Sequence, residues 1–150
     1  MTEPITGGCQ CGHVRYAING AIFSAHICHC RMCQKAFGNY FAALVGVAKT
    51  EIKWTRGEPH YFRSSAAVKR GFCGDCGTPL TFAYDNAAHM NISIGSLDRP
   101  ELAKLENQFG VEARQAAFEA MHILPPSRTE DDLSVGDLRN LKSLQHPDHD

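Results

Sequence analysis

Cys73-Gly74-Asp75-Cys76-Gly77 is the stretch that decides the fold of this chain, because it is one half of a metal-binding pattern. The other half is Cys9-Gln10-Cys11-Gly12, far earlier in the sequence. A tetrahedral structural zinc needs four thiolate or imidazole ligands, usually as two pairs on separate turns. The glycine after each pair permits positive φ angles, which a turn wrapped around a metal often needs. Together the pairs would staple the N-terminal strand to the centre of the domain and contribute directly to folding.

The remaining cysteines, Cys28, Cys30 and Cys33, form a local set of three. Three protein ligands with a free fourth position is the pattern of a catalytic zinc, where water or substrate completes the tetrahedron. A short helix is plausible over residues 31–37, and its N-terminal amides would favour the thiolate forms of Cys30 and Cys33. The His29 side chain, on an extended Cys-His-Cys segment, would point away from the metal. We therefore expect His29 to be a pocket residue and not a ligand.

Metal ligation accounts for all seven cysteines, because none lies outside these clusters. Disulfides are disfavoured, since the number is odd and the sequence carries no export signal. We expect two zinc ions per chain. Spacing alone leaves other pairings of the clusters open. All seven cysteines could instead have a structural role, with His26 or His89 as the fourth ligand of the second site. A further alternative is an iron–sulfur cluster, which would use four cysteines and leave three without a role.

The bulk composition excludes several function classes. The 150 residues are one domain in size, and a formal net charge of −1 offers no basic excess for a nucleic-acid backbone. Residues 1–6 have neither a positive start nor an apolar run, so no signal peptide is expected. The longest apolar stretch, residues 40–47, is too short to span a bilayer. We expect a cytoplasmic protein that binds neither nucleic acid nor membrane.

Short β-branched and aromatic runs between turn residues predict a mainly β, antiparallel fold. The runs are His13–Ile18, Tyr40–Val47, Ile52–Trp54, His60–Phe62, Leu80–Tyr84 and Met90–Ile94. Asn19-Gly20, between two apolar runs, predicts a hairpin turn. A second helix is predicted over residues 111–122, which are rich in alanine and are followed by Pro125-Pro126.

The sequence divides into a zinc domain over residues 1–126 and a polar, peripheral tail over residues 127–150. Within the tail, a weak apolar spacing at Val135, Leu138 and Leu141 predicts one or two helical turns at the surface. The tail histidines are expected to be solvated.

Four segments carry a resemblance to a known family. They are Gly7–Tyr16, Cys28–Lys35, Arg70–Leu80 and Ile94–Glu101. Together they resemble the glutathione-dependent formaldehyde-activating enzyme family, which shares its domain with centromere protein V. The match covers residues 5–125, and three cysteine motifs in the same order and spacing make it specific.

The resemblance implies an Mss4-like fold of several coiled antiparallel sheets with short helices. At matching positions the family's structural zinc ligands fall on Cys9, Cys11, Cys73 and Cys76, and its catalytic zinc ligands on Cys28, Cys30 and Cys33. The implied activity joins formaldehyde and glutathione to S-hydroxymethylglutathione, or cleaves that adduct as a carbon–sulfur lyase. The implied partners are a small thiol, such as glutathione, and an aldehyde.

One region departs from the family pattern. Its members usually carry a His-aromatic segment and then a Pro-Trp pair near the pocket, whereas this chain has Asn107-Gln108-Phe109-Gly110 and Ala116-Ala117-Phe118. If these segments shape the pocket, the chain accepts a different thiol or adduct. Candidate cations for the carboxylates of such a thiol are Arg31, Lys35, Arg63, Lys69 and Arg70, although solvated surface charge is the commoner role for any one of them.

Two competing functions remain. One is a non-catalytic zinc module that binds a partner, by analogy with the fold and the centromere relative. The other is a metal carrier or redox sensor that uses the Cys28 cluster. An open three-ligand site favours the enzyme over a binding module, which has no need of a free metal position.

Overall fold

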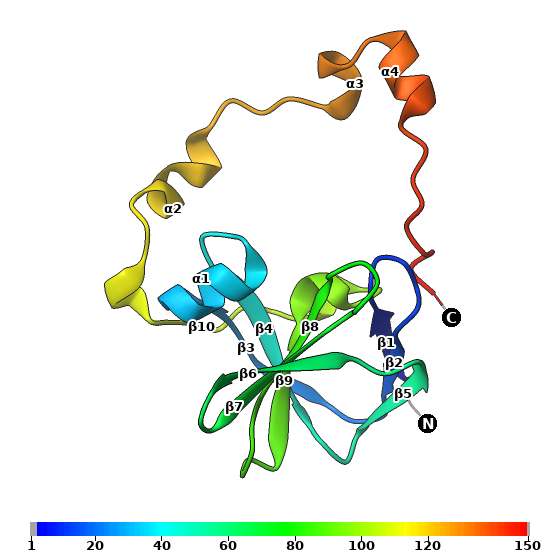
Figure 1. Cartoon of the computed structure of the whole chain (residues 1–150). Helices are drawn as coiled ribbons and strands as arrows, with labels where there is room; N and C mark the ends of the chain where they lie inside the picture. Colours follow the sequence, from blue (N-terminus) through cyan, green and yellow to red (C-terminus); the bar gives the residue numbers. More distant parts are fainter. Residues whose placement is uncertain (1–2, 150) are drawn as a thin grey trace.

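The computed structural model describes residues 3–149, which form two β-sheets with a few short helices (Figure 1). The smaller sheet has the strand order β1-β2-β5, and the larger has the order β10-β3-β4-β9-β8-β7-β6. The strands are β1 (Ile5–Gly8), β2 (Arg15–Ile18), β3 (Ile22–Cys28), β4 (Ala42–Ala48), β5 (Ile52–Arg56), β6 (His60–Ser65), β7 (Val68–Phe72), β8 (Pro79–Tyr84), β9 (His89–Ser93) and β10 (Asn107–Phe109). The predicted mainly β fold is confirmed.

Helices are short and lie outside the sheets. The predicted first helix is confirmed as α1 (Arg31–Phe37), which begins after Cys30 and ends at Gly38 in the left-handed conformation. The others are α2 (Ala117–Ala120), α3 (Thr129–Asp132), α4 (Val135–Asn140) and the 3₁₀ turns η1 (Ile94–Ser96), η2 (Pro100–Leu102), η3 (Val111–Ala113) and η4 (Met121–Ile123). Within residues 3–149, no helix has both the length and the apolar character needed to cross a membrane.

The apolar core has two parts, and each cysteine cluster lies on one of them. The main part gathers fully buried side chains from both sheets, such as Tyr16, Leu80 and Ile92, and it includes Cys9 and Cys73. A smaller part contains three buried residues, with partly buried neighbours packed against it; the three are Cys33, Ala42 and Leu44. The two candidate metal sites are therefore held by different regions of the fold.

The edge strand β10 was not predicted, and it pairs in parallel with β3, whereas all the other strand pairs are antiparallel. Its register places Phe109 opposite Cys28. The segment that departs from the family pattern thus lies directly beside the three-cysteine loop.

The hairpin predicted at Asn19-Gly20 is wrong. β2 is the central strand of its sheet, with β1 and β5 on its two edges, so it has no free edge for β3. β3 pairs instead with β4 and β10 in the other sheet. Asn19-Gly20 therefore carries the chain from one sheet to the other.

The single helix predicted over residues 111–122 is also wrong. The chain forms η3, α2 and η4 in succession, with extended backbone at Arg114 between the first two. Most of these side chains are exposed, so no apolar stripe packs against the sheets. Alanine propensity alone does not sustain a short helix without such packing.

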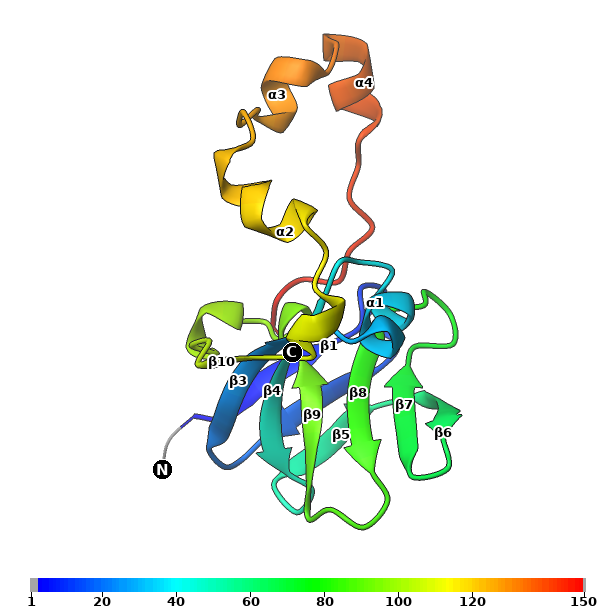
Figure 2. The same ribbon diagram turned by 90° about the vertical axis from the view of Figure 1, so that its left-hand side faces the viewer.

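Residues 117–149 form a strap that stands away from the sheets and returns to them near β1 and β2 (Figures 1 and 2). The predicted helical turns are confirmed in α4. On its return the strap reaches the first cysteine loop, where the backbone N–H of His146 donates to the carbonyl of Gln10 at 2.8 Å. Arg56 also lies 3.2 Å from the His146 ring, so this histidine is partnered and not merely solvated.

Candidate metal centres

The four-cysteine cluster has the geometry of a closed metal site. The sulfurs of Cys9, Cys11, Cys73 and Cys76 lie within 4.8 Å of one another. The Cys9 and Cys11 sulfurs are 3.5 Å apart, and those of Cys11 and Cys73 are 3.8 Å apart. Zinc–sulfur bonds of about 2.3 Å in a tetrahedron put the sulfurs about 3.8 Å apart, so the donor set fits zinc.

Tight turns set this geometry. The N–H of Gly12 donates to the carbonyl of Cys9, and the N–H of Gly77 donates to that of Cys73, each at 3.0 Å. Both glycines have positive φ, at 76° and 77°. The N–H of Val14 donates to the Cys9 sulfur at 3.2 Å.

The three-cysteine cluster surrounds the start of α1. Cys28 ends β3, Cys30 is the residue before the helix, and Cys33 lies in its first turn. Their sulfurs also lie within 4.8 Å of one another, and across residues 3–149 the group includes no further His, Cys, Asp or Glu. The spacing of this triad can thus hold a metal ion with a position left for an outside ligand.

The histidines that were considered as a fourth ligand lie elsewhere. His26 contacts the carbonyl of Ser24 through Nδ1 at 2.8 Å, and its ring packs on Phe109. His89 packs its ring against Phe23. Neither belongs to the triad, so the structure gives no support to a triad closed by histidine.

Two of the triad sulfurs have pKa values shifted in opposite directions. A hydrogen bond with Cys28, opposed by burial and assisted by Arg70, lowers the pKa of Cys33 to about 5. The same sulfur–sulfur interaction raises the pKa of Cys28 well above its ordinary value. Cys33 therefore ionises more readily than Cys28, and a bound cation would favour the thiolate form of all its ligands.

His29, between two cysteines of the triad, has neighbours from both segments that depart from the family pattern. The His29 ring is fully buried, and its Nε2 lies 2.9 Å from the amide oxygen of Gln108. Phe118 packs edge-on against the same ring, with centroids 4.7 Å apart. Both segments that depart from the family pattern therefore meet at His29, which lies outside the ligand group as expected.

Gln34 is a structural contributor that the sequence analysis did not identify. Its side chain is buried, and its amide nitrogen donates to the carbonyls of His29 at 2.7 Å and Ala113 at 2.9 Å. These bonds tie α1 to the cysteine loop and to η3. The sequence did offer a signal for its burial. Gln34 follows Cys30 by four residues and precedes Phe37 by three, so the three lie on one helix face.

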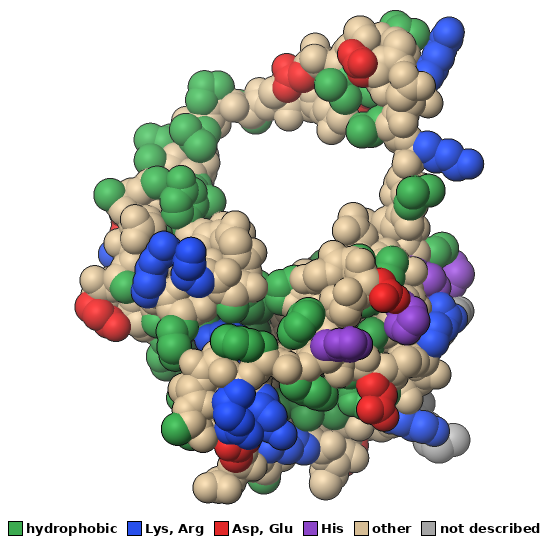
Figure 3. Space-filling model, in the orientation of Figure 1, with side chains coloured by type: hydrophobic (Ala, Val, Ile, Leu, Met, Phe, Trp, Pro, Cys, Tyr) green, Lys and Arg blue, Asp and Glu red, His purple; other side chains and the backbone are tan. Residues whose placement is uncertain are grey.

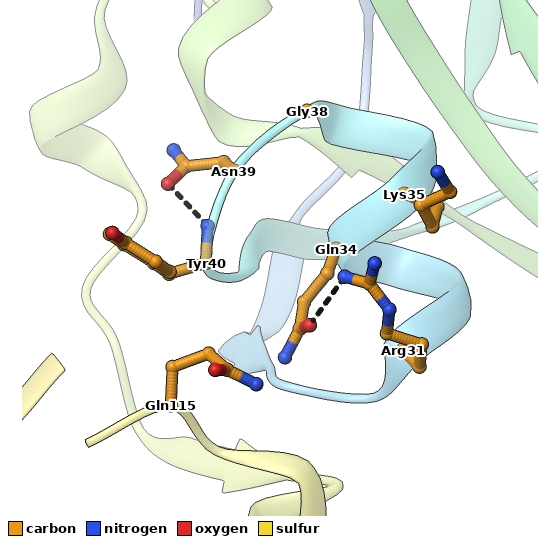
Figure 4. Close-up of a pocket in the computed structure, with 7 residues that line it drawn as sticks. All are labelled: Arg31, Gln34, Lys35, Gly38, Asn39, Tyr40 and Gln115. Carbon is orange, nitrogen blue, oxygen red and sulfur yellow. Dashed lines mark hydrogen bonds between the residues drawn. The ribbon is translucent and has the colours of Figure 1, made fainter. Parts of the chain in front are cut away.

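Among the cavities beside α1, two are lined by both Arg31 and Lys35. The larger, of about 690 Å³, is drawn in Figure 4; its lining residues are Arg31, Gln34, Lys35, Gly38, Asn39, Tyr40 and Gln115. The smaller, of about 340 Å³, is lined by Arg31, Met32, Lys35, Ala36, Phe62, Ser64 and Arg70. Figure 3 shows basic side chains over α1 on this face.

The remaining candidate cations serve elsewhere. Arg63 pairs with Asp85 at 2.8 Å, and Lys69 lies over the Tyr61 ring at 5.9 Å. Neither lines either cavity beside α1. Asp75, between two members of the four-cysteine cluster, pairs with His13 of the other loop at 2.7 Å and lines neither of these cavities.

The family model for glutathione-dependent formaldehyde-activating enzymes matches residues 4–112, well over half of the chain. The chain belongs to this family. The matched region contains both cysteine clusters and β10. It ends within η3, before the strap that begins with α2.

A solved structure agrees on the fold. A crystal structure of a Rhodobacter sphaeroides protein superposes with a TM-score of 0.56 at 18% sequence identity, covering 69% of this chain and 99% of that one. None of the curated proteins matches the chain. The family therefore rests on the sequence model, and the crystal structure supports the architecture.

Proposed function

We propose that this chain is a zinc-dependent carbon–sulfur lyase that forms or cleaves a thiol–aldehyde adduct, such as S-hydroxymethylglutathione from glutathione and formaldehyde. The observation that carries the proposal is the triad of Cys28, Cys30 and Cys33, whose ligand group contains no fourth His, Cys, Asp or Glu within residues 3–149. Family membership supports the reaction class.

In this proposal the two clusters have different roles. The sulfurs of Cys9, Cys11, Cys73 and Cys76 hold a structural zinc, and those of Cys28, Cys30 and Cys33 hold a second one. Zinc bound by the triad would supply Lewis acidity and lower the pKa of a thiol brought to it. The chain's own residues position the triad: α1 presents two of the sulfurs, and Gln34 fixes the loop that joins the first two.

The cavities beside α1 would hold the two reactants together. Confinement converts a bimolecular encounter into a local one, which is worth several kcal/mol of barrier, on the order of 7–11 in favourable cases. Glutathione carries two carboxylates, and Arg31 and Lys35 line both cavities. The two cations support a small anionic thiol as the partner.

The test is NMR exchange spectroscopy of glutathione with formaldehyde, because the two combine without any enzyme and only the rate reports catalysis. We expect faster exchange with protein that holds both zincs than with protein stripped of the labile second zinc. Exchange at the uncatalysed rate, with two zincs confirmed per chain, would contradict the proposal and direct attention to other thiol adducts or to a binding role.

A further inference from the structure

Arg70 on β7 is a buried cation with an incomplete set of partners. Its side chain is only 6% exposed, and its Nε donates to the Ser64 hydroxyl at 3.1 Å. Its NH2 donates to the Cys33 sulfur at 3.4 Å, and its guanidinium lies over the Phe82 ring at 4.8 Å. NH1 is buried and has no hydrogen-bond partner within residues 3–149. Such an unpaired donor on a buried cation is costly.

The other buried arginine shows what Arg70 lacks. Arg15 directs both terminal nitrogens at Asp98, with NH1 2.9 Å from Oδ1 and NH2 2.5 Å from Oδ2. A carboxylate satisfies the planar fork of an arginine in this bidentate way. No ion pair with an acidic residue is found for Arg70 in the described chain. An anion from outside the chain would fill that role.

The cavity at Arg70 suits such an anion. Its lining residues include three cations and no acidic residue. The rest of the wall is mostly apolar, from Met32, Ala36 and Phe62. At about 340 Å³ it has room for a carboxylate on a short carbon stem. The same guanidinium borders this cavity and touches Cys33, so it connects the cavity with the triad.

We propose that Arg70 is a specificity-determining residue that selects thiols carrying a carboxylate, because the charge of its guanidinium attracts that carboxylate into the cavity while NH2 stays on Cys33. The inference rests on the proposed use of the triad as an open metal centre. The carboxylate supplies at Arg70 the negative charge that Asp98 supplies at Arg15, without the bidentate contact, and its position near Cys33 brings the thiol of the same molecule to the triad.

Two thiols with the same two-carbon stem test this selection by binding, without turnover. Cobalt(II)-loaded protein is titrated with 3-mercaptopropionate and with 2-mercaptoethanol, and the sulfur-to-cobalt charge-transfer band reports thiol binding. We expect the charged thiol to bind at least about ten-fold more tightly, which corresponds to about 1.4 kcal/mol. Arg70→Gln should abolish this preference, and Arg70→Lys should retain part of it, because lysine keeps the charge without the fork.

Arg63→Gln is the matched control, since it removes an arginine charge on the adjacent strand that lines neither cavity. This variant should keep the full preference. A preference that survives in metal-loaded Arg70→Gln overturns the proposal, as does one that disappears equally in Arg63→Gln.

A second substitution tests the cavity without disturbing the contact to Cys33. Phe62 is 63% exposed at the cavity wall, so Phe62→Glu places a repelling carboxylate there with little risk to folding. Phe62→Glu should lose the preference and Phe62→Gln should keep it; equal behaviour of the two would also overturn the proposal. Glutathione–formaldehyde exchange is measured separately. A carboxylate preference without catalysed exchange contradicts only the proposed function. Catalysed exchange without a carboxylate preference contradicts only this inference.

Discussion

The two cysteine clusters use the same ligand in opposite ways. The four-cysteine cluster joins turns that are far apart in sequence, and two of its members, Cys9 and Cys73, are part of the main core. The triad residues are close together in the sequence and lie on the smaller part of the core. They adjoin α1, which lines the two cavities that contain Arg31 and Lys35. The number of ligands and their separation in the sequence thus distinguish the two sites. The four-cysteine cluster stabilises the fold, whereas the triad is positioned by the fold.

This difference has an energetic basis. A metal that joins distant segments removes much of the conformational freedom of the unfolded chain, so its binding energy becomes folding energy. A metal on Cys28, Cys30 and Cys33 closes only a short loop that β3 and α1 already position. Loss of the metal at the four-cysteine cluster should therefore unfold the chain, whereas loss of the metal at the triad should chiefly abolish catalytic activity.

Cys73→Ser is expected to have the largest effect. Cys73 is fully buried, and a structural zinc contributes roughly 10–16 kcal/mol, which matches or exceeds the whole stability of a typical domain. The variant should lose one zinc and its cooperative thermal transition, measured by circular dichroism with metal analysis. A cooperative transition within a few degrees of wild type would refute the structural role of this cluster.

Asp98→Asn should have the next largest effect, because Asp98 supports the region beside the closed cluster. It accepts hydrogen bonds from Arg15 and Thr6 and lines a cavity with Cys9. Breaking a buried pair from one side costs about 3–5 kcal/mol, so urea unfolding near neutral pH should show a loss of this size. The triad should keep its metal.

The pH dependence of that loss follows from the Asp98 pKa. Burial acts to raise it, but the hydrogen bonds from Arg15 and Thr6 outweigh burial and hold the pKa below its ordinary value. The Asp98 contribution is therefore complete above about pH 4, the unfolded-state value, and is lost as the pH falls through the lower folded-state pKa. The difference between wild type and Asp98→Asn should be constant from pH 7 to pH 5 and shrink below about pH 4. Metal content is followed in parallel, because acid releases metal from both proteins.

Cys33→Ala tests the open cluster and should affect stability less. The variant should lose the second metal and any catalysed exchange while the first metal and the fold remain. Loss of one small buried side chain costs about 1 kcal/mol, or roughly 2–4 °C in Tm for a chain of this size. Met32→Leu, the neighbouring exposed position, is the control and should retain both metals. Retained exchange in Cys33→Ala with only one zinc would contradict the catalytic assignment.

Local signals made much of this fold predictable. The cysteine before residue 31 and the glycine at 38 mark the ends of α1, and the cysteine spacings indicated two groups of four and three that the structure does bring together. Turn chemistry was less informative: Asn19-Gly20 turns the chain but does not pair its flanking strands. Which strand occupies a free edge depends on the whole sheet and not on the turn.

The unpredicted parts of the site depend on tertiary contacts. β10 has only three residues, and nothing in its composition indicates that it pairs with β3. Arg70 was one of five candidate cations in the sequence; its burial against Cys33 distinguishes it from Arg63, which pairs with Asp85 at the surface. Charge is visible in a sequence, but desolvation of that charge is a property of the packed chain.

Truncation after Pro126 should have the smallest effect, because we propose that residues 127–150 are peripheral to both clusters. The strap's apolar side chains are largely solvent-exposed, as in Leu144 at 87%, and on its return it meets the closed cluster's loop through the hydrogen bond from His146 to Gln10. The truncated chain should keep both zincs and lose at most about 1 kcal/mol, measured by thermal unfolding with metal analysis. His146→Ala isolates the contact at Gln10 and should account for most of that loss. If truncation instead releases the first zinc, the four cysteines do not suffice to close their own site, and the distinction between a closed and an open cluster would depend on the strap.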